Sequence, residues 1–419
     1  MFLIRSDGNA RIGAGHLMRC LTIAQELALL RGIEEICFLC ADQESAALVR
    51  DNGFPCHVLG TDYRDMESEL PQWEGLWRKL QSGKAASMAE LSDSLGEASA
   101  PEKPSAFLEG ISGEVPAPKE ASAFSEEASV LKEASAFKEG DFFPGRIAVR
   151  KYGAVILVDS YYATDSYLAA LGRMAYVVLM DDMGTHRYPA DCVVNYNAPA
   201  DYKAYRRLYQ GSAVRLLIGS RYVPLRRQFT DGGAGGGAKP EQPVRDVLIT
   251  TGGGDSENIA GKILDKIYSD AFSFHLVTGR FNPFFRELKE LEGEHSNIHI
   301  HHDVKDMAGL MRRCQIALTA GGSTVYELAA LGVPFICFSY AENQEALVEY
   351  VGGRQIAGSA GAWHRDQPKT LETIGRLFKE LAADPGLRRS YSESERAMTD
   401  GKGAGRLAQE IADLARRPA

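Results

Sequence analysis

The chain has 419 residues, with 47 Lys and Arg against 56 Asp and Glu, a formal net charge of −9 and 45% hydrophobic residues. That length predicts two or three domains, each able to bury an ordinary core. The modest acidity, and the lack of any Lys/Arg run of about five or more, argue against a nucleic-acid partner. No apolar stretch approaches the roughly 18 residues of a membrane helix, so no membrane partner is expected either. Seven cysteines, mostly inside apolar runs, are typical of buried thiols in a reduced, cytoplasmic protein, and an enzyme is the class that remains.

Residues 82–140 differ in composition from the rest of the chain. Glu-Ala-Ser-Ala occurs three times there, and the segment holds 11 acidic residues, 5 lysines and 4 prolines. With almost no large aliphatic side chains, it cannot bury enough apolar area to offset its chain entropy. The composition predicts a disordered, low-complexity insertion in a surface loop, and the prolines and glycines disfavour a helical coiled segment. An unknown partner for this insertion stays open.

The first part of the chain alternates strands with helices. We expect strands at 2–5, 35–40, 154–158, 175–180 and 192–194, and a helix at 17–30 after a glycine-rich turn. Each strand is a short, largely apolar run bounded by polar residues, as expected for parallel strands buried on both faces.

The second part repeats this pattern after 229–244, a Gly- and Pro-rich segment that predicts a linker. We expect strands at 247–250, 272–277, 298–301, 316–318 and 334–338, helices at 259–267 and 325–331, and an amphipathic helix at 406–417. Two βαβ series predict an α/β fold with two Rossmann-like, doubly wound domains, 1–228 and 245–419, facing a cleft.

The turn before the first helix carries the main chemical signal. Gly13 and Gly15 let the backbone approach a ligand, and the helix start offers free N–H groups to an anion. Met18 stands where a dinucleotide fingerprint needs its third glycine, so a nicotinamide cofactor is poorly supported. His16 falls in the first helical turn, where the positive helix end would favour a neutral imidazole able to accept a proton. The alternative is a histidine that merely caps the helix.

The second domain contains two turns suited to anions. One includes Gly252 and Gly253, and the other runs from Gly322 through Ser323 and Thr324 into a helix. Turns on neighbouring strands can hold a diphosphate, and a carboxylate one helical turn further on, Glu327, can accept both hydroxyls of a ribose. The alternative is two ordinary tight turns with an N-cap at Ser323. There is no Gly-Lys-Ser/Thr, so this is not a P-loop.

Several sequence blocks together resemble a known family. They are Ile12-Gly13-Ala14-Gly15-His16-Leu17-Met18-Arg19-Cys20-Leu21, Val158-Asp159-Ser160-Tyr161, Asp181-Asp182, Asn195-Tyr196-Asn197, Gly219 to Arg226, Gly-Gly-Ser-Thr-x-x-Glu at 321–327 and Glu342-Asn343-Gln344. The chain resembles the UDP-2,4-diacetamido-2,4,6-trideoxy-β-L-altropyranose hydrolases of pseudaminic acid biosynthesis, within the GT-B superfamily. It is similar, more distantly, to the N-acetylglucosaminyltransferase that completes the peptidoglycan lipid precursor. The resemblance covers almost the whole chain except 82–140.

The resemblance implies a UDP-sugar substrate bound mainly by the second domain. His16 matches the general base that activates water for attack at the anomeric carbon, with inversion. The implied substrate contacts are Gly13, Gly15, Arg19, Asp159, Gly252, Gly253, Gly322, Ser323, Thr324, Glu327, Asn343 and Gln344. UDP is already a good leaving group, so neither a metal nor another cofactor is implied, and a two-carboxylate glycosidase site is not needed.

Other candidate sites are weaker. His299, His301 and His302 share one strand and cannot close a metal tetrahedron by themselves. Cys37 and Cys40 have redox spacing but lie in an apolar run, which predicts core thiols. Three functions stay open from the sequence: the hydrolase, a GT-B glycosyltransferase in which His16 deprotonates an acceptor hydroxyl, and a sugar-nucleotide binder without catalysis.

Overall fold

The computed structural model describes residues 1–9, 11–33, 35–81, 153–230, 240–252, 255–279 and 282–416. The predicted insertion at 82–140 and Gly253 lie outside the described residues. Within the described part, seven parallel strands form one sheet: in spatial order β3 (Cys56–Val58), β2 (Ile36–Cys40), β1 (Phe2–Ser6), β4 (Val155–Asp159), β5 (Tyr176–Met180), β6 (Cys192–Asn195) and β7 (Arg215–Ile218). Six more form a second parallel sheet: β10 (Ile298–His302), β9 (Ser273–Thr278), β8 (Asp246–Thr250), β11 (Ile316–Ala320), β12 (Phe335–Ser339) and β13 (Gly358–Ala362).

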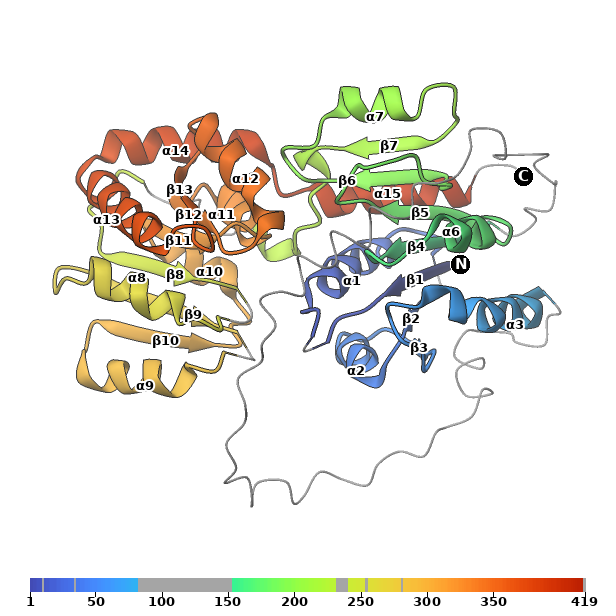
Figure 1. Ribbon diagram of the computed structural model, residues 1–419, viewed down its shortest axis with the longest axis horizontal. Coiled ribbons are helices and arrows are strands. Elements are labelled where there is room, and N and C mark those ends of the chain that lie inside the picture. The colour runs from blue at the N-terminus through green and yellow to red at the C-terminus, as the bar shows by residue number, and fades with distance from the viewer. Residues whose placement is uncertain are drawn as a thin grey trace, which may run out of the picture.

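Helices connect the strands of each sheet. The first sheet carries α1 (Gly15–Leu27), α2 (Gln43–Asp51), η1 (Met66–Glu69), α3 (Leu70–Gln81), α6 (Asp165–Gly172) and α7 (Tyr202–Leu208), followed by the short η2 (Ser220–Tyr222) and η3 (Arg227–Phe229). The second carries α8 (Ile259–Ile267), α9 (Phe285–Glu294), α10 (Met307–Arg313), α11 (Thr324–Leu331), α12 (Glu342–Gly353), α13 (Gln367–Ala383) and α14 (Pro385–Met398), and α15 (Gly403–Ala415) ends the described chain. Figure 1 shows the two sheets side by side, with the arrowheads of β7 and β10 directed toward the other domain.

Both faces of the first sheet are buried, as the apolar runs of its strands predicted. Alternate residues of β1 enter different clusters: Ile4 packs with residues of α1, α2 and α15, whereas Leu3 packs with Trp73 of α3 and Tyr167 of α6. Because successive side chains of a strand point to opposite faces, an all-apolar strand needs a helical layer on each side. The sheet is therefore the middle of three layers.

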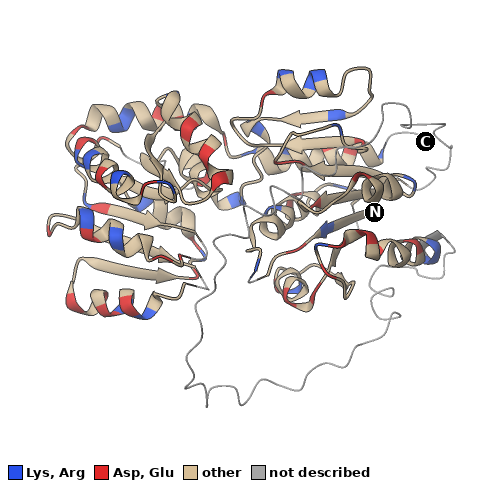
Figure 2. Cartoon of the chain, viewed as in Figure 1, with Lys and Arg blue, Asp and Glu red and all other residues tan. Residues whose placement is uncertain are grey.

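The second sheet follows the same rule. Leu248 of β8 belongs to the cluster of α10 and α11, and its neighbours Val247 and Ile249 pack with α8 and α13. Figure 2 shows that the strands of both sheets are largely uncharged and that Lys, Arg, Asp and Glu lie mostly on the helices. Both sheets have the strand order 3-2-1-4-5-6 expected of a Rossmann domain, to which β7 adds one strand. The prediction of two doubly wound α/β domains is confirmed.

The chain crosses from the second domain back to the first after α14. The Ser220 hydroxyl donates to the Met398 carbonyl at 2.6 Å where this crossing begins. Gly403 then lies so close to the backbone of Val223 that an added Cβ would clash with it. The apolar face of α15, with Leu407 and Ile411 at most 1% exposed, packs on α1. The sequence placed all of 245–419 in the second domain, and α15 differs from that prediction because its apolar face completes the first domain.

The described strands agree closely with the predicted ones, apart from three that the sequence pattern missed. β3 has only three residues, and β13 reads Gly-Ser-Ala-Gly-Ala, without a large apolar side chain. β7, Arg215–Ile218, is the added strand at the edge. No helix in the described part of the chain is long and apolar enough to cross a membrane.

Candidate functional site

The glycine-rich turn after β1 is held by Asn9. Its side-chain oxygen accepts hydrogen bonds from the backbone N–H groups of Arg11 (3.0 Å) and Ile12 (3.2 Å), and its amide donates to Asp42 at 2.9 Å. Gly13 follows with a φ of +73°, a conformation that glycine adopts without strain. The residue before α1 is Ala14, which has no side-chain acceptor, so the first N–H groups of the helix face outward without a cap. This turn brings His16 to the carboxyl end of the sheet.

His16 pairs with a buried carboxylate from the neighbouring strand. Its Nδ1 lies 2.7 Å from Oδ1 of Asp159, which ends β4 and is 1% exposed. Because an ionised carboxylate only accepts hydrogen bonds, Nδ1–H is the donor, and the lone pair of the neutral ring lies on Nε2. The side chain of His16 is 18% exposed, so the imidazole is accessible beside a fixed partner. The pair can therefore present a proton acceptor to a bound molecule.

Arg19 organises the same carboxylate from one helical turn further along α1. Its Nε donates to Oδ2 of Asp159 at 2.6 Å, and its Nη1 and Nη2 donate to Asp182 at 3.1 and 2.9 Å. Nη1 also donates to the Tyr196 hydroxyl at 2.8 Å. The guanidinium, 10% exposed, thus has its donors engaged by groups at the ends of β4, β5 and β6. Arg19 was predicted as a substrate contact. In this structure its guanidinium donates hydrogen bonds to Asp159 and Asp182.

The electrostatics keep the two carboxylates ionised. Burial alone raises the pKa of Asp159, but the positive charge of Arg19 and hydrogen bonds from Arg19 and His16 outweigh it, and the pKa lies well below its usual range. The pKa of Asp182 is likewise lowered, since Arg19 again outweighs burial. An ionised Asp159 stabilises the positive charge that His16 acquires when it takes a proton.

Aromatic and amide side chains close this network. The Tyr161 hydroxyl donates to Asp182 at 3.2 Å, and the Tyr161 ring packs edge-on against the His16 ring, with centroids 4.6 Å apart. Asn197 donates to Asp182 at 3.2 Å. Burial raises the pKa of Tyr196 to about 12, so its hydroxyl stays neutral beside Arg19. We refer to His16, Arg19, Asp159, Tyr161, Asp182, Tyr196 and Asn197 as the base network.

The base network occupies the topological switch point of the first sheet. β1 lies between β2 and β4, so the chain leaves it in opposite directions on its two sides, and doubly wound sheets bind ligands at that position. His16 follows β1 and Asp159 ends β4. The second sheet has the equivalent position between β8 and β11.

The predicted turns of the second domain lie at that equivalent position. Gly252, with a φ of +95°, follows β8, and Gly322 follows β11, the strand paired with β8. Gly321 is in close contact with α12, since an added Cβ would lie 2.6 Å from Cγ2 of Val348 and 3.3 Å from Cβ of Gln344. The structure therefore brings Gly321, the neighbour of Gly322, against Gln344, and the exposed Asn343 precedes Gln344 in the first turn of α12.

The start of α11 leaves its polar groups available. Ser323 precedes the helix with a φ of −58°, and its side chain makes no capping hydrogen bond. The structure therefore does not show the side-chain N-cap that was the alternative explanation for Ser323. The hydroxyls of Ser323 and Thr324 make no hydrogen bond to any other described residue, and Ser323 is exposed. Free hydroxyls and N–H groups at a helix start are suited to phosphate oxygens.

Glu327 has a partner that the sequence did not reveal. Its Oε1 accepts a hydrogen bond from Nη2 of Arg226 at 3.2 Å, across the two domains, and its side chain is 15% exposed. Burial raises the pKa of Glu327 and Arg226 partly opposes this shift. The Arg226 contact uses only Oε1 of Glu327, so the other carboxylate oxygen is left for the proposed ribose contact.

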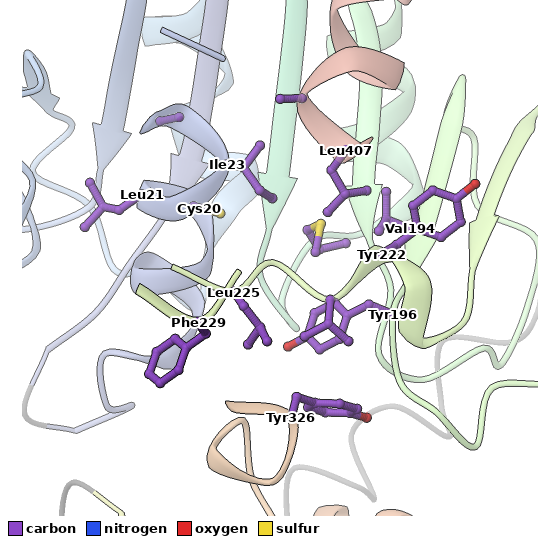
Figure 3. Close-up of a cluster of buried hydrophobic side chains, with 14 of the residues drawn as sticks. Cys20, Leu21, Ile23, Val194, Tyr196, Tyr222, Leu225, Phe229, Tyr326 and Leu407 are labelled. Atoms are coloured by element: carbon purple, nitrogen blue, oxygen red, sulfur yellow. The ribbon is translucent and has the colours of Figure 1, made fainter. Parts of the chain in front are cut away.

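The two domains meet directly beside the base network. The Tyr326 hydroxyl of α11 accepts a hydrogen bond from the backbone N–H of Ala198 at 2.9 Å, in the loop after β6. In Figure 3 Tyr326 approaches Tyr196, and the two rings lie edge-on with centroids 6.1 Å apart. Asp182, Tyr161, Tyr196 and Arg226 lie within the sequence blocks that carry the resemblance, whereas Asn9 and Tyr326 were not among the candidate residues. The strand-end positions of the first three were the available signal.

The weaker candidates were the cysteines and the histidines of β10, and each has an explanation within the fold. All seven cysteines are buried, which confirms the prediction of core thiols for Cys37 and Cys40. His301 contacts Nδ1 of His275 at 3.0 Å, and the other ring nitrogen of His275 lies 2.9 Å from Asp246. In the described ranges, no three His, Cys, Asp or Glu side chains are arranged to hold a metal ion.

Comparisons with known proteins give relatives of low sequence identity. No family model matches the chain. It is 26% identical over 213 residues, half of its own length, to the spore coat polysaccharide biosynthesis protein SpsG of Bacillus subtilis, and spans 61% of that protein. It is 24% identical over 200 residues to the UDP-2,4-diacetamido-2,4,6-trideoxy-beta-L-altropyranose hydrolase of Campylobacter jejuni, covering 47% of this chain and 70% of the relative.

Among solved structures, MurG from Acinetobacter baumannii matches 99% of this chain and 99% of its own, with a TM-score of 0.52 and 12% identity. At that identity the likeness concerns the fold alone. The fold is of the GT-B type: two Rossmann-like domains whose strands have their carboxyl ends directed toward the other domain.

Proposed function

We propose that the protein hydrolyses a UDP-activated 2,4-diacetamido-2,4,6-trideoxyhexose to UDP and the free sugar, as a step toward a nonulosonate such as pseudaminic acid. The observation that carries the proposal is the hydrogen bond between His16 and Asp159 at the switch point of one domain. It is supported by the free Ser323 and Thr324 hydroxyls at the equivalent point of the other domain. The name of the Campylobacter relative supports the substrate class.

The proposed reaction is a single displacement. Nε2 of His16 accepts a proton from water as the water oxygen bonds to the anomeric carbon, and the bond from that carbon to the β-phosphate oxygen breaks. UDP leaves with the electron pair, and attack from the opposite face inverts the anomeric centre. Asp159 holds the ring through Nδ1–H and stabilises the imidazolium.

The departing diphosphate needs no acid in this scheme. Ser323, Thr324 and the backbone N–H groups at the start of α11 would contact the phosphates, and Gly322 would allow their close approach. Gly252, Asn343, Gln344 and Glu327 would complete the site, and Gly13 and Gly15 would let the sugar approach the first domain. No resident metal or organic cofactor is part of the proposal.

The decisive experiment is turnover in ¹⁸O-water with the UDP-sugar and no acceptor. Release of UDP that carries no ¹⁸O is the expected result, because attack at carbon leaves the diphosphate oxygens untouched. Labelled UDP would show attack at phosphorus, and no UDP release without an added sugar or lipid acceptor would favour a glycosyltransferase. Binding of UDP without turnover under either condition would favour a sugar-nucleotide binder.

The base is tested by His16→Ala, expected to lower kcat by about 10²–10⁴ with UDP affinity within twofold of wild type. His295→Ala is the matched control, since His295 follows α9 at the amino end of β10, away from both switch points. A His16→Ala enzyme as active as the control would rule out the base assignment.

A further inference from the structure

Tyr326 lies at the contact between the two domains. It is the third residue of α11, is 1% exposed, and its hydroxyl accepts the Ala198 N–H at 2.9 Å. This hydrogen bond joins a helix of the second domain to a loop of the first. A hydrogen bond from this half-buried backbone N–H to a side chain of another domain fixes the loop only while the two domains are docked.

The loop that Tyr326 holds carries part of the base network. Tyr196 accepts a hydrogen bond from Arg19, and Asn197 donates to Asp182. The guanidinium of Arg19 also lies over the Tyr196 ring, 5.3 Å from its centroid. A displacement of this loop would therefore move Arg19, and with it the carboxylate that orients His16.

The same helix begins at the proposed diphosphate turn. The backbone N–H of Tyr326 donates to the Ser323 carbonyl at 3.0 Å, so Tyr326 and Ser323 belong to one helical turn. The other end of α11 is held by α14, because Ser392 donates to the Gly332 carbonyl and Arg396 to the Leu331 carbonyl. α11 is therefore fixed within its own domain and reaches the other through Tyr326 and the Glu327–Arg226 ion pair.

We propose that Tyr326 is a positioning residue that couples occupancy of the Ser323 turn to the orientation of His16. The connection runs from Tyr326 to the Ala198 loop, from Tyr196 of that loop to Arg19, and from Arg19 through Asp159 to His16. The ligand at the turn would be a nucleoside diphosphate, and the coupling rests on the proposed function for its catalytic consequence. Each hydrogen bond of this connection is 2.6–2.9 Å long and joins buried or half-buried groups.

The first test uses the full protein without ligand. In ¹⁵N-histidine NMR spectra, Tyr326→Phe should move the ring-nitrogen resonances of His16. Tyr209→Phe is the matched control, because the Tyr209 hydroxyl also accepts a backbone N–H, that of Tyr188, at 2.9 Å but touches no residue of the base network. Unmoved His16 resonances in Tyr326→Phe, or equal movement in both variants, would overturn the proposal.

The second test adds UDP alone as the probe. Saturating UDP should move the His16 resonances in wild type and in Tyr209→Phe, but by less than half as much in Tyr326→Phe, with the Kd for UDP within twofold in all three proteins. Equal movement in all three would overturn the proposal. If wild type binds no UDP, the proposed function fails, and the ligand-free spectra still decide whether Tyr326 positions His16.

Measurement of kcat and KM distinguishes a positioning role of Tyr326 from a general loss of structure. Loss of one neutral hydrogen bond predicts about a fivefold fall in kcat for Tyr326→Phe with KM unchanged. A parallel rise in KM, or the same fall in Tyr209→Phe, would indicate loss of structure and would count against the proposal.

Discussion

Replacing Asp159 by asparagine removes the charge at the centre of the base network and keeps the size of the side chain. Asp159 now accepts from His16 at 2.7 Å and from Nε of Arg19 at 2.6 Å. An asparagine can accept from only one of these donors, and its amide group would face a donor on the other side. The protonated form of His16 would lose the stabilisation given by an ionised partner, and the ring would keep its orientation only where the amide oxygen faces Nδ1.

The size of the effect follows from these contacts. In serine proteases the corresponding change costs about 10⁴ in kcat, because the histidine takes the wrong tautomer. Here the amide oxygen can still accept from Nδ1, so we expect a fall of about 10²–10³, or roughly 3–4 kcal/mol of transition-state stabilisation. Stability should fall by about 3 kcal/mol, the lower end for a broken buried pair, because Arg19 keeps Asp182 as a partner.

The assay compares kcat for UDP release with the free energy of unfolding in urea. Asp7→Asn is the matched control: Asp7 is also a buried aspartate beside the end of a strand, it pairs with the buried Arg5, and it accepts the Ala41 N–H at 2.7 Å. Its partners are Arg5 and Ala41, not His16. We expect a smaller loss of stability in Asp7→Asn, because burial raises the pKa of Asp7 and Arg5 keeps Glu69 as a partner, and a kcat within about threefold of wild type in that variant alone.

The pH dependence gives an internal check on this reasoning. Because the pKa of Asp159 is lowered in the folded protein, its stabilisation is complete above the unfolded pKa of about 3.9 and is lost as the pH falls below it. The stability deficit of Asp159→Asn should therefore be constant above about pH 8, where imidazole groups are neutral and Asp159 is ionised in both the folded and the unfolded chain. A kcat within tenfold of that of Asp7→Asn would refute the orienting role of Asp159.

Three further outcomes are expected. Ser323→Ala should weaken UDP binding about tenfold by calorimetry with little change in stability, whereas a loss of about 1 kcal/mol in stability would show that Ser323 caps α11 after all. Glu327→Gln should weaken binding of UDP but not of its 2′,3′-dideoxy analogue, and equal weakening of both would exclude a ribose contact. Burial raises the pKa of Glu395, so its stabilising contribution is present below the unfolded pKa of about 4.3 and is lost as the pH rises through the folded pKa. The Tm of Glu395→Gln should therefore rise relative to wild type between pH 5 and pH 8, and a constant difference would contradict this.

Much of the architecture was accessible from the sequence because the strands are buried on both faces. An uninterrupted apolar run such as Val155–Val158 has one physical explanation in an alternating α/β pattern, so position and type follow together. β13 was not predicted because its sequence, Gly-Ser-Ala-Gly-Ala, has no such apolar run. Its place at the edge of the sheet comes from its pairing with β12. The packing of α15 on α1 was not predicted, because an amphipathic pattern shows that one face of a helix is buried but does not show which element covers that face.

The candidate site divides in the same way. His16 and the glycine turns were identifiable, since each follows a predicted strand and precedes a predicted helix. The partner of His16 was not, because Asp159 lies 143 residues further along the chain and only the pairing of β1 with β4 brings the two together. Tyr326 was hidden for another reason: a tyrosine in an apolar helix is usually core, and its role depends on a backbone N–H of the other domain.

The return of α15 to the first sheet also determines when the first domain can form during synthesis. Residues of β1 and α1 emerge from the ribosome early, but the helix that covers α1 is Gly403–Ala415. Until that helix has emerged, part of the apolar surface of α1 has no native partner, and contacts this far apart in sequence form slowly. The second domain also needs α13, whose Ile374 and Phe378 are part of its core, and α14, so both domains are completed only by the last described helices, and the first domain is completed last.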